Sequence, residues 1–229
     1  MSNSSNPRDI IAWLVPTARG TSADKATHLP ANMARTIDIS ASSSHHLSSK
    51  LSHPPGCAPQ RAIQLCFSQE PLRRGRFVLG TDANRCDVLL PPAPGISAQH
   101  CSIGFDAESR LVLDDFSEAG TQVWYDWACS GDQRGHSWIL SRGDQRVVID
   151  VQGVRFQLVV NDRSADWEAY RADVDAFCRP PPSREAVPSL YVQPLIRHIF
   201  VKGLGGEHTG DVYLWDLSRP WEPMVKASA

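Results

Sequence analysis

The sequence predicts a mainly β protein whose folded part is a β-sandwich. Residues 61–162 contain short runs rich in β-branched and aromatic residues, and turn-forming residues separate these runs. The run at 154–158 alternates with a period of two, as a strand with one buried face does. Many short strands without long helices between them are typical of sandwiches and barrels. A segment of about 100 residues is large enough to hold its own core.

The expected strands follow one another along this segment. Turn chemistry separates them at residues 92–95, 106–109, 142–144 and 152–153, where Gly, Pro, Asp and Ser gather. The predicted strands are residues 62–67, 76–79, 88–90, 101–105, 111–113, 122–124, 138–140, 147–151 and 154–160.

Residues 1–60 are expected to form a disordered tail rich in Ser and Pro. Runs such as residues 42–44 and 54–56 leave little apolar surface to bury, so ordering them would cost more entropy than it recovers. The apolar hexamer at residues 10–15 interrupts this tail. The pattern leaves two interpretations open, a short binding motif or a piece that packs against the folded domain.

One short helix is predicted after the sandwich, at residues 164–179. Apolar residues recur there at three- and four-residue steps, which gives a helix one apolar stripe. Three prolines at 180–182 end the helix. Residues 163–194 are therefore predicted to be a helix and a Pro-rich linker. The stripe consists of Trp167, Tyr170, Val174 and Phe177.

The composition excludes several classes of function. The 23 Lys and Arg residues nearly balance the 25 Asp and Glu residues, so a net charge of -2 gives no general attraction to nucleic acid or to a membrane surface. No run approaches the ~20 apolar residues of a membrane-spanning helix. The six cysteines form no Cys-x-x-Cys pair, so we expect no metal site but reduced thiols in an intracellular protein of the nucleus or cytoplasm.

Polar residues stand at set intervals between the expected strands of residues 77–123. A Gly-Thr pair ends the strand at 76–79, a Ser-x-x-His motif precedes the strand at 101–105, and a second Gly-Thr pair precedes the strand at 122–124. In this order the motifs resemble those of the forkhead-associated (FHA) domain, a β-sandwich that binds phosphothreonine peptides. The residues that carry the resemblance are Gly80, Ser97, His100, the Asp-x-Ser residues Asp114, Asp115 and Ser117, and Gly120 and Thr121.

The resemblance implies a role for each of these residues. In the family the Ser of Ser-x-x-His contacts the phosphate, the His braces the loops, and the later turn positions the peptide. Gly80 and His100 are therefore predicted to be structural. The predicted phosphopeptide-binding residues are Thr81, Arg85, Ser97, Gly120 and Thr121.

The chain departs from the family pattern at two positions. Thr81 stands where the family has the Arg that contacts the phosphate, and Ala119 stands where the family has an Asn that positions the peptide. Arg85 lies four residues after Thr81 and offers a planar fork of donors to the same loop face. The other candidate bases are Arg73, Arg74 and Arg76.

An aromatic-rich stretch at residues 124–138 supports a second interpretation. Trp124, Tyr125, Trp127 and Trp138 either fill the end of the sandwich or form an exposed surface for a partner. In the second case the domain would be a degenerate FHA scaffold that binds unphosphorylated proteins.

Residues 195–229 resemble the first strands of a protein kinase catalytic domain. Gly205, Gly210 and Val212 fit the Gly-rich loop that covers ATP, although Glu207 replaces the middle glycine, and Lys226 fits the strand Lys that pairs the phosphates. No His-Arg-Asp or Asp-Phe-Gly motif occurs in the chain. We therefore expect no catalytic residue and no activity. The segment would be a truncated kinase start that binds ATP without catalysis, and the chain has a cofactor only if more sequence completes this part.

Together these patterns predict a phosphothreonine-peptide-recognition module used in signalling. It would be part of, or derived from, an FHA-containing serine/threonine protein kinase. The expected partner is a phosphothreonine-containing protein, and neither nucleic acid nor a membrane is expected. The sequence leaves the oligomeric state open.

Overall fold

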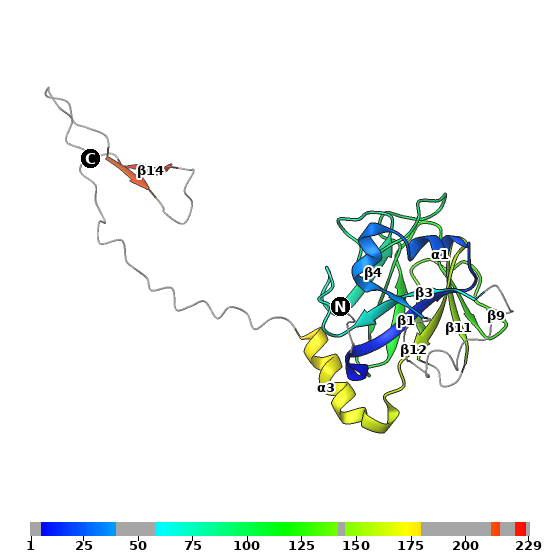
Figure 1. Cartoon of the computed structure of the whole chain (residues 1–229). Coiled ribbons are helices and arrows are strands. Elements are labelled where there is room, and N and C mark those ends of the chain that lie inside the picture. The colour runs from blue at the N-terminus through cyan, green and yellow to red at the C-terminus, as the bar shows by residue number, and fades with distance from the viewer. Residues whose placement is uncertain (1–5, 40–57, 142–144, 180–211, 216–222, 228–229) are drawn as a thin grey trace, which may run out of the picture. The chain divides into compact units, whose positions relative to one another are not determined.

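A computed structural model describes residues 6–39, 58–141 and 145–179, together with two strands near the C-terminus (Figure 1). The chain divides into two compact units, residues Met1–Pro180 and Pro181–Ala229. The first unit holds the 3-10 helices η1 (Pro7–Asp9), η2 (Pro30–Arg35) and η3 (Ser164–Asp166), the helices α1 (Ser22–Ala26) and α3 (Trp167–Cys178), and the strands β1 (Ile10–Pro16), β2 (Thr36–Asp38), β3 (Arg61–Cys66), β4 (Arg76–Gly80), β5 (Val88–Leu89), β6 (Cys101–Phe105), β7 (Leu111–Asp115), β8 (Gln122–Tyr125), β9 (Ala128–Cys129), β10 (Ser137–Ile139), β11 (Val147–Val151) and β12 (Val154–Val160).

Two sheets form the first unit and confirm the predicted sandwich. The larger sheet has seven strands in the order β2-β3-β1-β12-β11-β8-β9, and the smaller has five in the order β10-β7-β6-β4-β5. Neighbouring strands are antiparallel except β4 and β5, which are parallel. The two inner faces supply one apolar core, in which Leu14, Phe77, Ile103 and Phe156 are at most 1% exposed.

The N-terminal segment corrects the sequence-based prediction. Strand β1 lies inside the larger sheet, between β3 and β12, and all seven of its residues are buried. The prediction of a disordered tail over 1–60 is therefore wrong for residues 6–39. A strand buried on both faces is a continuous apolar run, and periodicity alone does not distinguish such a run from a binding motif. Of the two interpretations of residues 10–15, packing against the domain is the correct one.

A buried asparagine ties this N-terminal segment to the smaller sheet. Asn32 on η2 is fully buried, and its side chain donates to Leu89 O and accepts from Leu89 N, both at 2.8 Å. Since Leu89 belongs to β5, residues 6–39 contact both sheets of the sandwich. Residues 1–5 and 40–57 of the predicted tail lie outside the described residues.

The predicted helix after the sandwich is confirmed as α3. Tyr170 and Phe177 make edge-on contacts with Phe67 and Phe105, at ring-centroid distances of 5.8–6.2 Å. Trp167 remains 46% exposed and stacks on Tyr170. Helix α3 therefore extends the core at one end of the sandwich (Figure 1).

In the second unit two strands are described, β13 (Val212–Trp215) and β14 (Pro223–Ala227). They pair antiparallel, with Tyr213 opposite Lys226. Gly205 and Gly210 lie outside the described residues, as do residues 180–194 of the predicted helix and Pro-rich linker at 163–194. The resemblance of this unit to a kinase stays a prediction.

Candidate functional site

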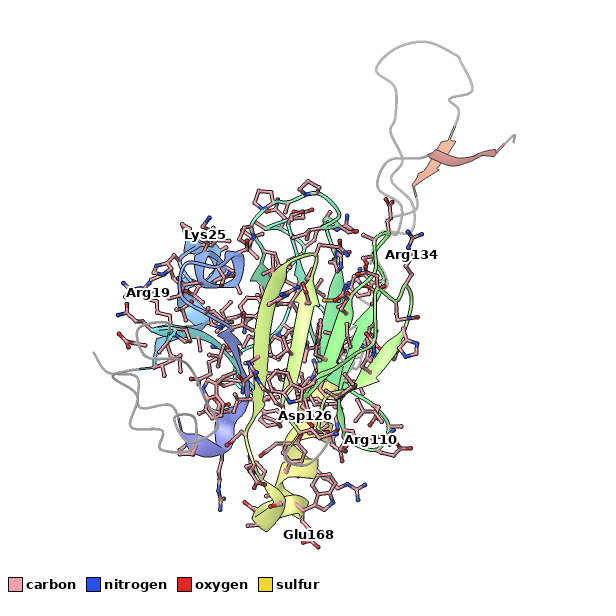
Figure 2. All side chains as sticks on the ribbon, turned by 90° about the vertical axis from the view of Figure 1, so that its right-hand side faces the viewer. Arg19, Lys25, Arg110, Asp126, Arg134 and Glu168 are labelled. Atoms are coloured by element: carbon pink, nitrogen blue, oxygen red, sulfur yellow. The ribbon has the colours of Figure 1, made fainter. Side chains whose placement is uncertain are left out.

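The predicted site residues gather at one end of the sandwich. Strands β4 and β7 end there and strands β6 and β8 begin there, because neighbouring strands of each sheet are antiparallel. The loops at residues 81–87, 91–100, 116–121 and 130–136 therefore lie at the same end. Figure 2 labels Arg134 at this end, and Asp126 and Arg110 at the opposite end.

His100 connects two of these loops from a fully buried position. Its Nδ1 accepts a hydrogen bond from Ser97 N at 3.1 Å, and its Nε2 donates to Gly120 O at 3.2 Å. This pattern places the proton on Nε2. Burial lowers the pKa of His100 and outweighs the opposite effects of the bond to Gly120 and of Asp115. The neutral imidazole therefore joins the loops at residues 91–100 and 116–121.

Asp115 is the centre of a second buried network. Its Oδ1 accepts from Ser117 Oγ and from Thr121 Oγ1, both at 2.7 Å, and its Oδ2 accepts from Gly135 N at 2.8 Å. Ser117 Oγ in turn accepts from Gly120 N at 2.8 Å. We call His100, Asp115, Ser117, Gly120 and Thr121 the buried brace.

Two glycines are required by close backbone approaches. A Cβ at Gly80 would lie 2.3 Å from Ala98 O, so no other residue fits at the end of β4. Gly120 has φ +88°, in the left-handed region, and a Cβ there would lie 3.1 Å from the backbone of Gln133. Both glycines therefore allow the loops to approach each other closely.

Two arginines converge on Gln99 at the surface of this end. Gln99 Oε1 accepts from Arg73 Nη2 at 3.0 Å and from Arg85 Nη2 at 2.9 Å, while Gln99 Nε2 donates to Arg85 O at 2.9 Å. Both arginines are exposed, and neither forms a salt bridge within the described residues. A neutral amide oxygen thus holds two cations together without neutralising them, which favours the approach of an anion.

Ser97 and Thr81 line the same loops. Thr81 N donates to Ser97 O at 3.3 Å, and Ser97 Oγ accepts from Glu118 N at 3.4 Å. Both residues are partly exposed, and the Ser97 hydroxyl has no acceptor for its own proton within the described residues. We call Arg73, Thr81, Arg85, Ser97 and Gln99 the exposed rim.

The structure separates the predicted peptide-binding residues into two groups. Thr81, Arg85 and Ser97 reach the surface, and Arg73 joins them. Thr121 is fully buried and bonded to Asp115, so the prediction that it contacts a peptide does not hold for its side chain. Gly120 is buried too, and its carbonyl accepts from His100 and Gln152.

The other two arginine candidates differ from Arg73. Arg76 forms a salt bridge with Asp114, and Arg74 is exposed and makes no hydrogen bond or salt bridge to Gln99 within the described residues. Sequence reasoning missed Gln99, although it lies inside the Ser-x-x-His motif. Its two arginine partners are 26 and 14 residues away, and no spacing rule links them.

Comparison with known proteins identifies a family for part of the sandwich. The model of the FHA domain matches residues 75–149, so this part of the chain is an FHA domain. Strands β1, β3 and β12 lie outside the match, which means that the sandwich extends beyond it on both sides. No curated protein matches the chain.

Solved FHA domains resemble the chain at low sequence identity. The FHA domain of MEK1 in complex with a phosphothreonine peptide of HOP1 is 23% identical, with a TM-score of 0.31 over 44% of this chain and 89% of that one. The FHA domain of the CT664 protein from Chlamydia trachomatis is 24% identical, with a TM-score of 0.30 over 43% and 83%. The N-terminal FHA domain of Rad53p from S. cerevisiae, bound to a phosphothreonine peptide, is 16% identical, with a TM-score of 0.31 over 60% and 97%. Because these TM-scores are low, the FHA assignment depends on the family model and on the strands themselves.

Metal binding and membrane crossing can be examined in the part of the chain that the structure describes. They contain no group of three or more His, Cys, Asp or Glu side chains placed to hold a metal ion. None of their helices is long and apolar enough to cross a membrane. Their cysteines are free thiols, and burial raises the pKa of Cys66 to about 11, which keeps that thiol protonated.

Proposed function

We propose that the exposed rim binds a phosphothreonine-containing segment of a partner protein. The observation that carries this proposal is the convergence of Arg73 and Arg85 on Gln99, beside Ser97. A phosphate dianion accepts charge-assisted hydrogen bonds from guanidinium groups and a further bond from a hydroxyl. The FHA assignment of residues 75–149 supports the same function.

In this proposal Arg85 and Arg73 take over the role of the arginine that Thr81 replaces. A hydrogen bond to a charged group contributes about 1.5–3 kcal/mol, which is about one to two decades of affinity. Two such donors from different loops compensate for the loss of one.

Binding of phosphorylated and unphosphorylated peptides tests the proposal. The full chain is titrated by fluorescence anisotropy against a degenerate phosphothreonine library and its unphosphorylated twin, at low and moderate salt. We expect selective binding to the phosphorylated library that weakens with salt and is reduced in Ser97→Ala. Equal binding to both libraries would show that the rim does not recognise phosphate.

This test requires the full chain, because a shorter fragment would lack parts of the sandwich. A fragment of residues 60–162 would lack β1, which separates β3 from β12 in the larger sheet, and α3, which extends the core. Loss of binding by such a fragment would report misfolding and not a missing phosphate site.

A second candidate function depends on the hairpin between β8 and β9. Trp127 is 88% exposed at its tip. The neighbouring Asp126 is fixed by two bonds with the backbone of Arg146, at 2.8 and 3.0 Å. A fixed and exposed Trp favours a protein-binding surface that does not need phosphate. A partner bound equally with and without phosphate, and lost in Trp127→Ala, would support this function.

We also propose, from the sequence resemblance alone, that residues 195–229 derive from the start of a serine/threonine protein kinase. The module would then serve intracellular signalling. ATP binding by the full chain, abolished in Lys226→Ala, would support the resemblance. Absence of ATP binding would contradict the derivation of this segment from a kinase.

A further inference from the structure

One large apolar side chain is exposed beside the two arginines. Phe116 is 42% exposed although it directly follows β7. Its backbone N–H donates to His100 O at 3.1 Å, and both of its sequence neighbours are buried in the brace. The brace therefore fixes the backbone that presents this ring to solvent.

The ring is connected to the exposed rim through Arg73. The guanidinium carbon of Arg73 lies 6.0 Å from the centroid of the Phe116 ring, at the outer limit of a cation–π contact. The same guanidinium group donates to Gln99, which also holds Arg85. The guanidinium groups of Arg73 and Arg85 and the exposed ring of Phe116 thus form one continuous surface.

A phosphopeptide on this surface would bring its flanking residues near the ring. Phosphate held by Arg73 and Arg85 fixes one point of the peptide, and an extended chain advances about 3.3–3.6 Å per residue. A residue close to the phosphothreonine therefore passes Phe116. An apolar side chain there would bury surface on a ring that is otherwise in contact with water.

We propose that Phe116 is a specificity-determining residue that selects an apolar side chain near the phosphothreonine. This proposal rests on the proposed function, since it needs phosphate on the rim. It adds the class of partner: a phosphothreonine segment with an aliphatic or aromatic residue close to the modified threonine.

Paired peptides test this selection. In each pair the phosphothreonine is kept, and one flanking position carries either Leu or Ala. We expect one flanking position at which the full chain prefers Leu by about three- to tenfold. In Phe116→Ala the preference at that position should fall to within about twofold, while Phe116→Leu should keep it.

The ratio of the affinities for the two peptides of a pair measures side-chain selection independently of phosphate binding. Loss of the ring also removes a contact of Arg73, but this change lowers the affinity for both peptides of a pair and cancels in their ratio. Trp167→Ala is the matched control, because it removes an exposed aromatic ring of α3 at the opposite end of the sandwich, where Figure 2 labels the neighbouring Glu168, and it should leave the ratio unchanged.

The possible failures are distinguishable. Binding that does not depend on phosphate would overturn the proposed function and this inference with it. Phosphate-dependent binding with no Leu preference, or with the same preference in the wild type and Phe116→Ala, would overturn the inference alone.

Discussion

The buried brace and the exposed rim lie at the same end of the sandwich, yet they follow the FHA pattern to different degrees. The brace keeps the residues that the family pattern leads one to expect, at His100, Ser117, Gly120 and Thr121, and each is held by hydrogen bonds. The rim departs from the pattern at Thr81. In our proposal folding alone requires the brace, whereas only the ligand requires the rim.

The largest expected effect is a loss of folding stability when the buried brace loses its central carboxylate. Asp115→Ala would leave the hydroxyls of Ser117 and Thr121 and the N–H of Gly135 without their acceptor. We expect the free energy of unfolding to fall by about 3–5 kcal/mol, measured by urea denaturation. Asp114→Ala is the matched control, since its partly exposed pair should contribute about 1 kcal/mol or less. Equal losses in the two variants would contradict the central role of Asp115 in the buried brace.

The next largest expected effect is the loss of phosphopeptide affinity when an arginine of the rim is removed. Arg85→Ala and Arg73→Ala should each weaken phosphopeptide binding about ten- to hundredfold and leave the urea midpoint nearly unchanged. Anisotropy and denaturation of the same samples check both statements. Arg171→Ala removes the same charge from the exposed face of α3 and should leave the affinity within about twofold. A large loss of stability in Arg85→Ala would place that residue in the brace.

The brace should also respond to pH. The pKa of His100 is lower in the folded protein than the usual 6.5, so the unfolded state binds a proton first as the pH falls. The stability that His100 contributes is fully present above about pH 6.5 and decreases below it. Unfolding free energies measured from neutral to mildly acidic pH should show this slope, and His100→Asn should flatten it. An unchanged slope in the variant would assign the effect to other groups.

The smallest expected effect is on phosphopeptide affinity, through the charge of Glu118 beside the rim. Glu118 is exposed, and its N–H lies on Ser97 Oγ. Because the two residues are neighbours in space, we expect the Glu118 carboxylate to repel a phosphate bound at Ser97. Glu118→Gln should strengthen phosphopeptide binding about two- to fivefold at low salt and less at high salt. Weaker binding in this variant would show that Glu118 holds the peptide instead.

The sequence predicted some residues of both the brace and the rim, because some of their contacts are local along the chain and others are not. The Ser-x-x-His and Gly-Thr motifs are local, and their spacing between short strands indicated the loops that His100 joins. Gln99 acquires its role only when Arg73, Arg85 and the loop meet in space. Strand β1 was missed for another reason: it is buried on both faces, and Ser-rich sequence follows it.

The central claim is that the arginines on Gln99 replace the arginine absent at Thr81. Phosphopeptide affinities of four proteins test it most directly: the wild type, Arg85→Ala, Thr81→Arg, and the variant that combines both substitutions. We predict that Arg85→Ala loses about one to two decades of affinity and that adding Thr81→Arg restores most of it. Wild-type affinity in Arg85→Ala, or no recovery in the combined variant, would contradict the claim.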